Sequence, residues 1–304
     1  MDVGVIGLGL VGHAIAGRLL AADHRVHGYD ISEAARERAT SAGIQVLEDA
    51  AGVARAAQIL FLCLMTSEDR RALLWGAQDL ASALRPGCLL LDIATARPAD
   101  ILTDAARLAE QQVRLVDVSL SGSSAVIGRG EALALVGDRE ADAGYRDLLA
   151  CFTKAQYFFD APGEGNRAKL VVNMVFGLNR LVLAEALGVA AKAGFNLNTM
   201  LDVLKAGETY SVCMDTKGLK MIDGAYEPPV ARLAQHAKDV DLILELARET
   251  GARAPVSELH AQLLRELVEA GHGNLDNAAI FKAFRKEQHH GESIAGHRRR
   301  RRGD

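Results

Sequence analysis

The sequence predicts an α/β fold class, in which a doubly wound parallel sheet is followed by an all-α domain. Two observations predict this order. Short apolar runs alternate with helical segments up to about residue 160, which is the pattern of a parallel sheet with helices on both faces. From residue 166 onward, helical periods continue with almost no strand signal. The composition, with 49% hydrophobic and 24% charged residues, is that of a globular protein.

The predicted strands are short apolar runs, as expected for strands that are buried on both faces. They occupy residues 3–7, 25–29, 59–64, 89–92 and 113–118, and the runs 132–136 and 156–159 extend the same sheet. Helices are predicted between them at 14–22, 32–42, 68–83 and 98–112, the last with Pro98 in its first turn.

The second half is predicted to begin after a break at Ala161-Pro162-Gly163. Helices are expected at 169–193, 197–205, 230–250, 257–270 and 276–286, and Gly194 suits the C-terminal end of the first. The predicted domains are therefore residues 1–162 and 163–290, followed by a short tail.

The tail carries five consecutive arginines at 298–302, although the formal net charge of the whole chain is −4. The body of the chain is therefore more acidic than the total suggests, which argues against a nucleic-acid-binding surface. We expect residues 291–304 to be a disordered, solvated tail, and we predict no nucleic-acid partner.

The cysteines indicate neither a metal site nor a disulfide framework. Cys63, Cys88, Cys151 and Cys213 form no C-x-x-C motif, and no His/Cys/Asp cluster has the spacing of metal ligands. We predict no metal and a reducing, cytoplasmic compartment. No signal peptide precedes the first strand and no apolar run reaches about 18 residues, so no membrane segment is expected.

A G-x-G-x-x-G motif follows the first predicted strand and opens a helix, the context that a dinucleotide-binding loop requires. The first glycine makes a tight turn, the second lets the backbone approach a pyrophosphate, and the third allows close helix–strand packing. The phosphates would lie at the helix N-terminus. The motif predicts a Rossmann-type, cofactor-binding sheet. Its residues are Gly7, Leu8, Gly9, Leu10, Val11 and Gly12.

Asp30 ends the second predicted strand. A carboxylate there accepts hydrogen bonds from a ribose hydroxyl and repels a 2′-phosphate, so it predicts NAD rather than NADP. A helix N-cap ahead of Ser32 fits the same residue. Arg36 and Arg38 lie close by in the sequence and keep NADP open as an alternative.

Three further blocks follow in the same order as in a known family: 117–123, 163–173 and 238–242. Together with the glycine loop they resemble the β-hydroxyacid dehydrogenase family. This family includes 3-hydroxyisobutyrate dehydrogenase, tartronate semialdehyde reductase and their L-threonate and sulfolactaldehyde relatives. The resemblance spans about residues 3–286. It implies an oxidoreductase that transfers a hydride between a nicotinamide cofactor and a small 3-hydroxy acid, similar to 3-hydroxyisobutyrate, or its semialdehyde.

The resemblance also implies roles for residues of these blocks. Ser121, Gly122 and Ser123 would bind the substrate carboxylate, because a hydroxyl and successive backbone N–H groups make an anion nest. Lys169 would be the general acid/base and Asn173 would orient it or the substrate hydroxyl. These two residues stand at i and i+4 and share one helix face. A partly desolvated lysine with a lowered pKa can take and return the hydroxyl proton.

The remaining implied contacts concern the cofactor. Lys238, in the segment Lys238-Asp239-Val240-Asp241-Leu242, would reach towards the cofactor or the substrate, while Asp239 would be structural. Met65, Thr66 and Thr95 follow strands and would contact the nicotinamide half.

The chain departs from the family pattern at three positions. Ser119, Ser123 and Val172 stand where the family usually has Pro, Gly and Asn, and we expect them to alter the substrate pocket.

Several alternatives stay open. One is an NAD(P)H-dependent semialdehyde reductase of the tartronate, succinic or sulfolactaldehyde type, and another is an L-threonate dehydrogenase. A third is a non-catalytic cofactor-binding protein, which only the arginine tail supports. The family resemblance further implies a homodimer or homotetramer formed through the helical half. Imine reductases share this fold but commonly lack the lysine, so Lys169 favours alcohol and carbonyl chemistry.

Overall fold

The computed structural model describes residues 1–139 and 143–285. The predicted tail, 291–304, lies outside the described residues. One eight-stranded sheet forms the centre of the first half, in the order β3-β2-β1-β4-β5-β6-β7-β8. Its strands are β1 Asp2–Ile6, β2 Arg25–Tyr29, β3 Gln45–Val46, β4 Ile59–Leu62, β5 Leu89–Asp92, β6 Arg114–Ser121, β7 Ala132–Gly137 and β8 Thr153–Phe159.

The strands β1 to β6 pair in parallel, whereas β7 runs antiparallel to β6, and β8 is parallel to β7. The strand order reverses at β1, which lies between β2 and β4. Such a reversal is the switch point beside which open α/β sheets bind their ligands. The predicted fold class, a Rossmann-type sheet followed by helices, is confirmed.

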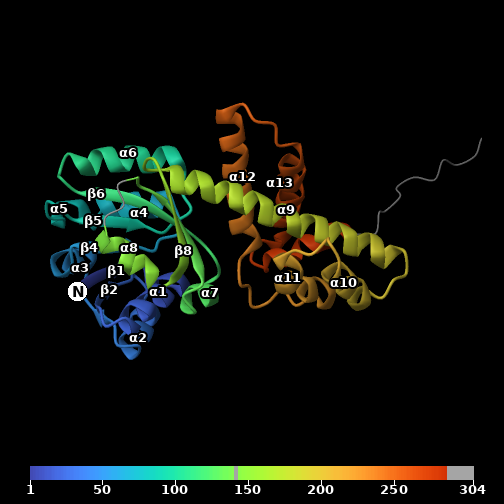
Figure 1. Ribbon diagram of the computed structural model, residues 1–304, viewed down its shortest axis with the longest axis horizontal. Helices are drawn as coiled ribbons and strands as arrows, with labels where there is room; N and C mark the ends of the chain where they lie inside the picture. The colour runs from blue at the N-terminus through green and yellow to red at the C-terminus, as the bar shows by residue number, and fades with distance from the viewer. Residues whose placement is uncertain (140–142, 286–304) are drawn as a thin grey trace, which may run out of the picture. The chain divides into compact units, whose positions relative to one another are not determined.

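Helices cover both faces of the sheet. The first half contains α1 Leu10–Ala21, α2 Glu33–Ser41, α3 Ala50–Ala56, α4 Ser67–Trp75, α5 Leu80–Ala83, α6 Pro98–Ala109, α7 Ser124–Gly128 and α8 Ala143–Ala150. The second half contains α9 Glu164–Lys192, α10 Leu197–Ala206, α11 Val212–Asp223, α12 Leu233–Thr250, α13 Pro255–Leu267, a π-helical turn Val268–His272, a 3-10 helix Asn277–Phe281 and α14 Lys282–Arg285. Figure 1 shows α6 on one side of the sheet and α1 and α2 on the other.

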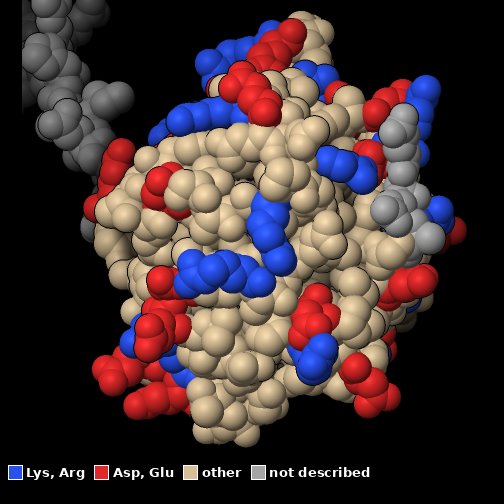
Figure 2. Space-filling model, turned by 90° about the vertical axis from the view of Figure 1, so that its left-hand side faces the viewer, with Lys and Arg blue, Asp and Glu red and all other residues tan. Residues whose placement is uncertain are grey.

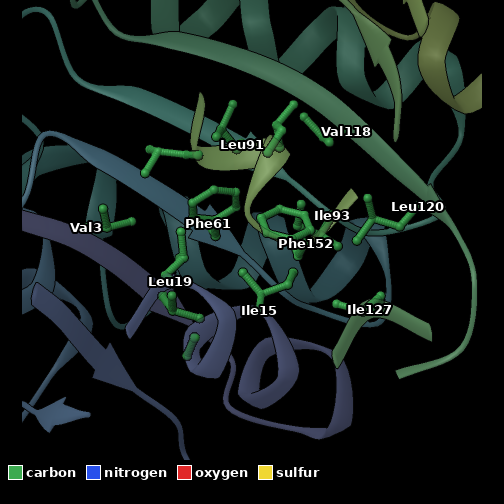
Figure 3. Close-up of a cluster of buried hydrophobic side chains, with 14 of the residues drawn as sticks. Val3, Ile15, Leu19, Phe61, Leu91, Ile93, Val118, Leu120, Ile127 and Phe152 are labelled. Carbon is green, nitrogen blue, oxygen red and sulfur yellow. The ribbon is translucent and has the colours of Figure 1, made fainter. Parts of the chain in front are cut away.

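Two apolar cores fix these layers. One core joins the sheet to α1, α2, α7 and α8, and in it Phe61 and Phe152 meet edge to face with ring centroids 5.8 Å apart. Figure 3 shows these rings beside Ile15 of α1 and Ile127 of α7. The other core joins the opposite face to α3, α4, α5 and α6. Burial on both faces explains why the central strands are almost wholly apolar.

Several elements differ from the prediction. The predicted helix 68–83 is divided into α4 and α5 at Gly76, where a Cβ would lie 2.4 Å from the carbonyl oxygen of Ala72. The elements β3, α3, α7, α8 and α11 were not predicted. In α11, Gly218 lowers helix propensity, but a Cβ there would lie 2.7 Å from Leu201 of α10. Close packing of the two helices therefore outweighs the local preference.

The chain forms two compact units by its internal contacts. Of the described residues, the first unit comprises 1–139, 143–178 and 235–261, and the second comprises 179–234 and 262–285. In the second unit, the buried carboxylate of Asp276 accepts hydrogen bonds from Lys217 at 2.7 Å and from the backbone N–H of Val230 at 2.9 Å. The division at residue 162 into domains with separate roles stays a prediction, since α9 continues from one unit into the other.

Among the described helices, α9 is long and apolar enough to cross a membrane by length and composition alone. The apolar residues of α9 do not form one uninterrupted run. Asn173, Arg180 and Glu185 divide them into shorter apolar runs. Its residues Leu183, Ala184 and Leu187 are buried. Core helices of soluble proteins meet the same criterion, so the feature is weak evidence for a membrane span.

Charged side chains of both signs are scattered over the face drawn in Figure 2, which is mostly tan, with some blue Lys and Arg side chains adjoining near its centre. Surfaces that bind nucleic acid gather positive charge in one patch instead. On the described part of this face, red Asp and Glu side chains are spread among the blue ones and no extended blue stripe is seen. The expectation that the protein has no nucleic-acid partner stays a prediction for the rest of the surface.

Candidate active site

The glycine loop has the geometry that its motif predicts. Gly7 has φ +92°, and a Cβ there would lie 2.4 Å from the carbonyl oxygen of Cys63. A Cβ on Gly12 would lie 1.8 Å from the carbonyl oxygen of Gly7, so only glycine lets α1 pack this close. At Gly9 a Cβ would meet nothing within 4 Å. The loop is therefore tight at its first and third glycines and open at its second.

The open side faces the start of α1. Gly9 is the N-cap, no side chain caps the helix, and no acidic residue stands in its first turn. Leu10 is exposed. The first N–H groups of a helix lack partners within it and favour an anion. This chemistry fits the pyrophosphate of a dinucleotide.

Asp30 ties the loop to the end of β2. Its carboxylate accepts hydrogen bonds from the backbone N–H of Leu8 and of Ser32, each at 2.7 Å. Arg36 donates to the carbonyl oxygen of Asp30 at 2.7 Å, so its guanidinium lies beside the acid, while Arg38 is exposed. The Asp30 carboxylate, which suits a ribose hydroxyl, and the Arg36 guanidinium, which suits a phosphate, therefore lie together.

The structure brings Met65, Thr95 and Lys238 together. The ammonium of Lys238, on α12, donates to the carbonyl oxygens of Thr95 at 3.3 Å and of Met65 at 3.5 Å. Thr66 instead caps α4, because its hydroxyl accepts from the backbone N–H of Asp69 at 3.0 Å. A small pocket adjoins the lysine, and its lining includes Ser67, Glu68, Thr95, Ala96, Arg97 and Lys238.

A buried carboxylate positions the start of α9. Asp117, at 0% exposure, accepts hydrogen bonds from the backbone N–H of Gly163 at 2.8 Å and of Asn166 at 2.7 Å. A Cβ on Gly165 would lie 2.5 Å from the carbonyl oxygen of Leu135. The side chain of Asn166 in turn accepts from the backbone N–H of Ala96 at 2.7 Å. These contacts join α9 to β6, β7 and the loop that carries Thr95.

Lys169 and Asn173 follow on the next turns of α9. Desolvation lowers the pKa of Lys169 to about 8, against the opposing attraction of the Asp239 carboxylate on α12. The side-chain amide of Asn173 donates to the same carboxylate at 3.3 Å. A lysine with a pKa near 8 exchanges its proton readily at neutral pH. Asp239 thus interacts with both Lys169 and Asn173.

The predicted substrate turn lies at the end of β6. Gly122 has φ +148°, and the hydroxyl of Ser123 accepts from the backbone N–H of Val126 at 3.4 Å. Ser121 and Asp117 stand at i+4 and i on the strand and share one face. Within the described residues, no hydrogen bond joins this turn to Lys169 or Asn173.

Comparisons with known proteins identify the family of the chain. A family model described as the NAD binding domain of 6-phosphogluconate dehydrogenase matches residues 2–160. A second, described as NAD-binding of NADP-dependent 3-hydroxyisobutyrate dehydrogenase, matches residues 163–284. The chain belongs to the β-hydroxyacid dehydrogenase family. It is an NAD(P)-dependent hydroxyacid dehydrogenase, an oxidoreductase that acts on CH–OH groups.

Two curated members of this family match almost end to end. L-threonate dehydrogenase from Cupriavidus necator is 28% identical over 285 residues, which cover 93% of this chain and 96% of that protein. 2-(Hydroxymethyl)glutarate dehydrogenase from Eubacterium barkeri is 29% identical over 298 residues, covering 97% and 98%. The crystal structure of 3-hydroxyisobutyrate dehydrogenase from Salmonella typhimurium has a TM-score of 0.86 at 24% identity and covers 93% and 99%.

In this β-hydroxyacid dehydrogenase, sequence reasoning missed a buried ionic cluster. Arg70 of α4, at 0% exposure, donates to Asp92 at the end of β5 at 2.5 Å and to Asp104 of α6 at 2.6 Å. The roles of Asp117 and Asn166 were missed as well, although both stand in matched blocks. Their partners lie 46 to 70 residues away in the sequence, so no local pattern reveals them.

Proposed function

We propose that this enzyme oxidises a small 3-hydroxy acid similar to 3-hydroxyisobutyrate, or reduces the corresponding semialdehyde, with Lys169 as general acid/base. The observation that carries the proposal is the place of Lys169 on α9. Burial lowers its pKa to about 8, and the Asp239 carboxylate lies near enough to act on it. The neutral amine can then take the hydroxyl proton of the substrate, and the ammonium can return it in the reverse reaction.

The nicotinamide cofactor, when bound, supplies the hydride acceptor for the carbinol carbon. Residues of this chain hold and orient the reactants. Asn173 gives its amide N–H to Asp239, which fixes the amide plane. We assign its carbonyl oxygen to orient the lysine or the substrate hydroxyl. Such orientation contributes to catalysis because a reaction between held groups needs no further ordering.

Ser121, Gly122 and Ser123 are proposed to bind the substrate carboxylate. The Ser123 hydroxyl accepts from Val126, which leaves its proton available for a carboxylate oxygen. The family usually has glycine at this position, so Ser123 adds one donor. This donor and the likeness to an L-threonate dehydrogenase favour a polyhydroxy acid such as L-threonate as the second candidate substrate.

For the cofactor we propose Gly7, Leu8, Gly9, Leu10, Val11 and Gly12 at the phosphates, and Met65, Thr66, Thr95 and Lys238 at the nicotinamide half. Asp30 favours NAD, since a carboxylate repels a 2′-phosphate. NADP is the alternative. The adjacent Arg36 guanidinium supports it, as does the matching family model, which is described for an NADP-dependent enzyme.

We further propose a homodimer or homotetramer in the cytoplasm. An apolar stripe on α9 supports self-association: Val171, Val175, Val182 and Val189 are each more than half exposed. Their spacing of four and seven residues places them along one helix face. The cysteines of the described residues are free thiols, which suits a reducing compartment.

Absorbance at 340 nm tests the substrate and the cofactor together. The protein is mixed with NAD or NADP and with 3-hydroxyisobutyrate, D-glycerate, L-threonate, 4-hydroxybutyrate or 3-hydroxypropionate, and the reductase reaction is followed with the semialdehydes. We expect turnover with one of the 3-hydroxy acids and a preference for NAD. Activity confined to 4-hydroxybutyrate, or to none of these acids while NADH still binds, would contradict the proposal.

A further inference from the structure

The buried cluster around Arg70 adjoins the loops that follow β4 and β5, since α4 begins where the first loop ends and Asp92 is the last residue of β5. Its guanidinium donates through Nη1 to Asp92 and through Nε and Nη2 to Asp104, at 3.0 and 2.6 Å. One side chain of α4 thus bridges the end of β5 and the middle of α6. The neighbouring Arg71 binds Asp104 and Asp100 from the solvent side and does not contact Asp92.

Stability alone gives a poor account of this cluster. Burying charges can cost more desolvation free energy than the pair regains, and apolar residues of similar volume often stabilise a protein as well or better. The cation also lies near the N-terminus of α4, where the helix dipole opposes it. Burial raises the pKa of Asp92 to about 6, against the attraction of Arg70. The cluster does fix how α4, the end of β5 and α6 are oriented to one another, because guanidinium–carboxylate hydrogen bonds have a specific geometry.

The elements that the cluster joins carry the loops of the proposed cofactor site. The other oxygen of Asp92 accepts from the backbone N–H of Ala94, at the start of the loop that carries Thr95. Arg70 itself lies in the first turns of α4, directly after Met65 and Thr66. Lys238 then joins the carbonyl oxygens of both loops from the other side. Arg70 and Lys238 therefore hold the same two loops, one from within the core and one at the surface.

We propose that Arg70 is a positioning residue for hydride transfer. Its bridge between Asp92 and Asp104 sets the spacing of the Met65–Thr66 loop and the Thr95 loop, which together hold the nicotinamide end of the cofactor. This inference rests on the proposed function, because that proposal assigns these loops to the nicotinamide half. Among the described residues, no hydrogen bond or ion pair of the cluster reaches the glycine loop or Asp30, which would hold the adenosine and phosphate end.

Two ligands separate positioning from a merely structural role. NADH reaches both ends of the site, whereas ADP-ribose lacks the nicotinamide. In Arg70→Met, we expect NADH to bind about tenfold more weakly and ADP-ribose to bind within about twofold of the wild type. Turnover should fall by about a hundredfold, the effect of a displacement near 1 Å at the reacting atoms. Arg71→Met is the matched control, and both affinities should stay unchanged in it.

Arg70→Lys covers the case in which Arg70→Met fails to fold. A lysine keeps the charge but cannot span two carboxylates in fixed geometry, so NADH affinity should fall with ADP-ribose unaffected. The inference would be overturned if the folded Arg70 variants bound both ligands as tightly as the wild type does. It would also be overturned if their affinities for NADH and for ADP-ribose fell by the same factor. These binding ratios do not depend on turnover, so a wild type that oxidises no hydroxy acid would refute the proposed function separately.

Discussion

At the residue scale, the chemistry depends on the protonation state of Lys169. Oxidation needs the neutral amine, and the pKa of this lysine is about 8. We therefore expect kcat/KM for hydroxy-acid oxidation to rise through pH 8 and to fall by about tenfold per pH unit well below it. Reduction needs the ammonium and should fall above pH 8. A pH–rate profile in both directions checks this.

Asp239 offers a second test at this scale. Its negative charge raises the pKa of Lys169, so Asp239→Asn should move the rising limb of the oxidation profile to lower pH. The exposed Asp241 on the same helix provides the control, since Asp241→Asn should leave the limb in place. An unshifted limb in Asp239→Asn would show that the carboxylate does not act on the titrating group.

The glycines of the loop should respond differently to the same substitution. Gly9→Ala adds a methyl where the protein leaves open space, so stability should be kept while NADH affinity falls by about tenfold or more. Gly12→Ala forces a methyl against the carbonyl of Gly7 and should cost about 1–3 kcal/mol of stability. Gly17→Ala, in open space on α1, is the control. Urea unfolding and NADH fluorescence measure the two effects.

At the element scale, the start of α9 depends on Asp117. Asp117→Ala removes the acceptor of two buried backbone N–H groups and should cost about 1–3 kcal/mol of stability. Because Lys169 lies one turn further along, turnover should fall as well. Asp117→Asn keeps one acceptor oxygen and should lose less of both. If the alanine variant unfolded at the wild-type urea concentration, the carboxylate would not be holding this helix.

The elements also show what a sequence can and cannot reveal. The glycine loop was predictable because its G-x-G-x-x-G spacing and its place between a strand and a helix lie within one short segment, in which Gly12 packs against the carbonyl oxygen of Gly7. The bonds of Asp117 and Arg70 were not, because their partners are 22 to 49 residues away and periodicity carries no sign of them. The helix α11 was missed although it contains Gly218, which lowers helix propensity but lets the helix pack closely against Leu201 of α10.

At the scale of the whole molecule, the apolar stripe on α9 should mediate self-association. Val175→Lys together with Val182→Lys places charge in the middle of the stripe, and we expect the oligomer to dissociate. Val256→Lys, at an equally exposed valine on α13, should leave it intact. Light scattering after size-exclusion chromatography gives the mass. A wild-type protein of monomer mass, 32.4 kDa, would contradict the expectation.

Catalysis in this enzyme is proposed to depend on Lys169, and the variant to measure is Lys169→Ala. With the hydroxy acid that the wild type oxidises, turnover at saturating cofactor should fall by about 10²–10⁴-fold, the usual contribution of a general acid/base. NADH affinity and the urea midpoint should stay near wild-type values, so that the loss is assigned to chemistry. Near-normal turnover in a folded, NADH-binding Lys169→Ala would show that Lys169 is not the general acid/base.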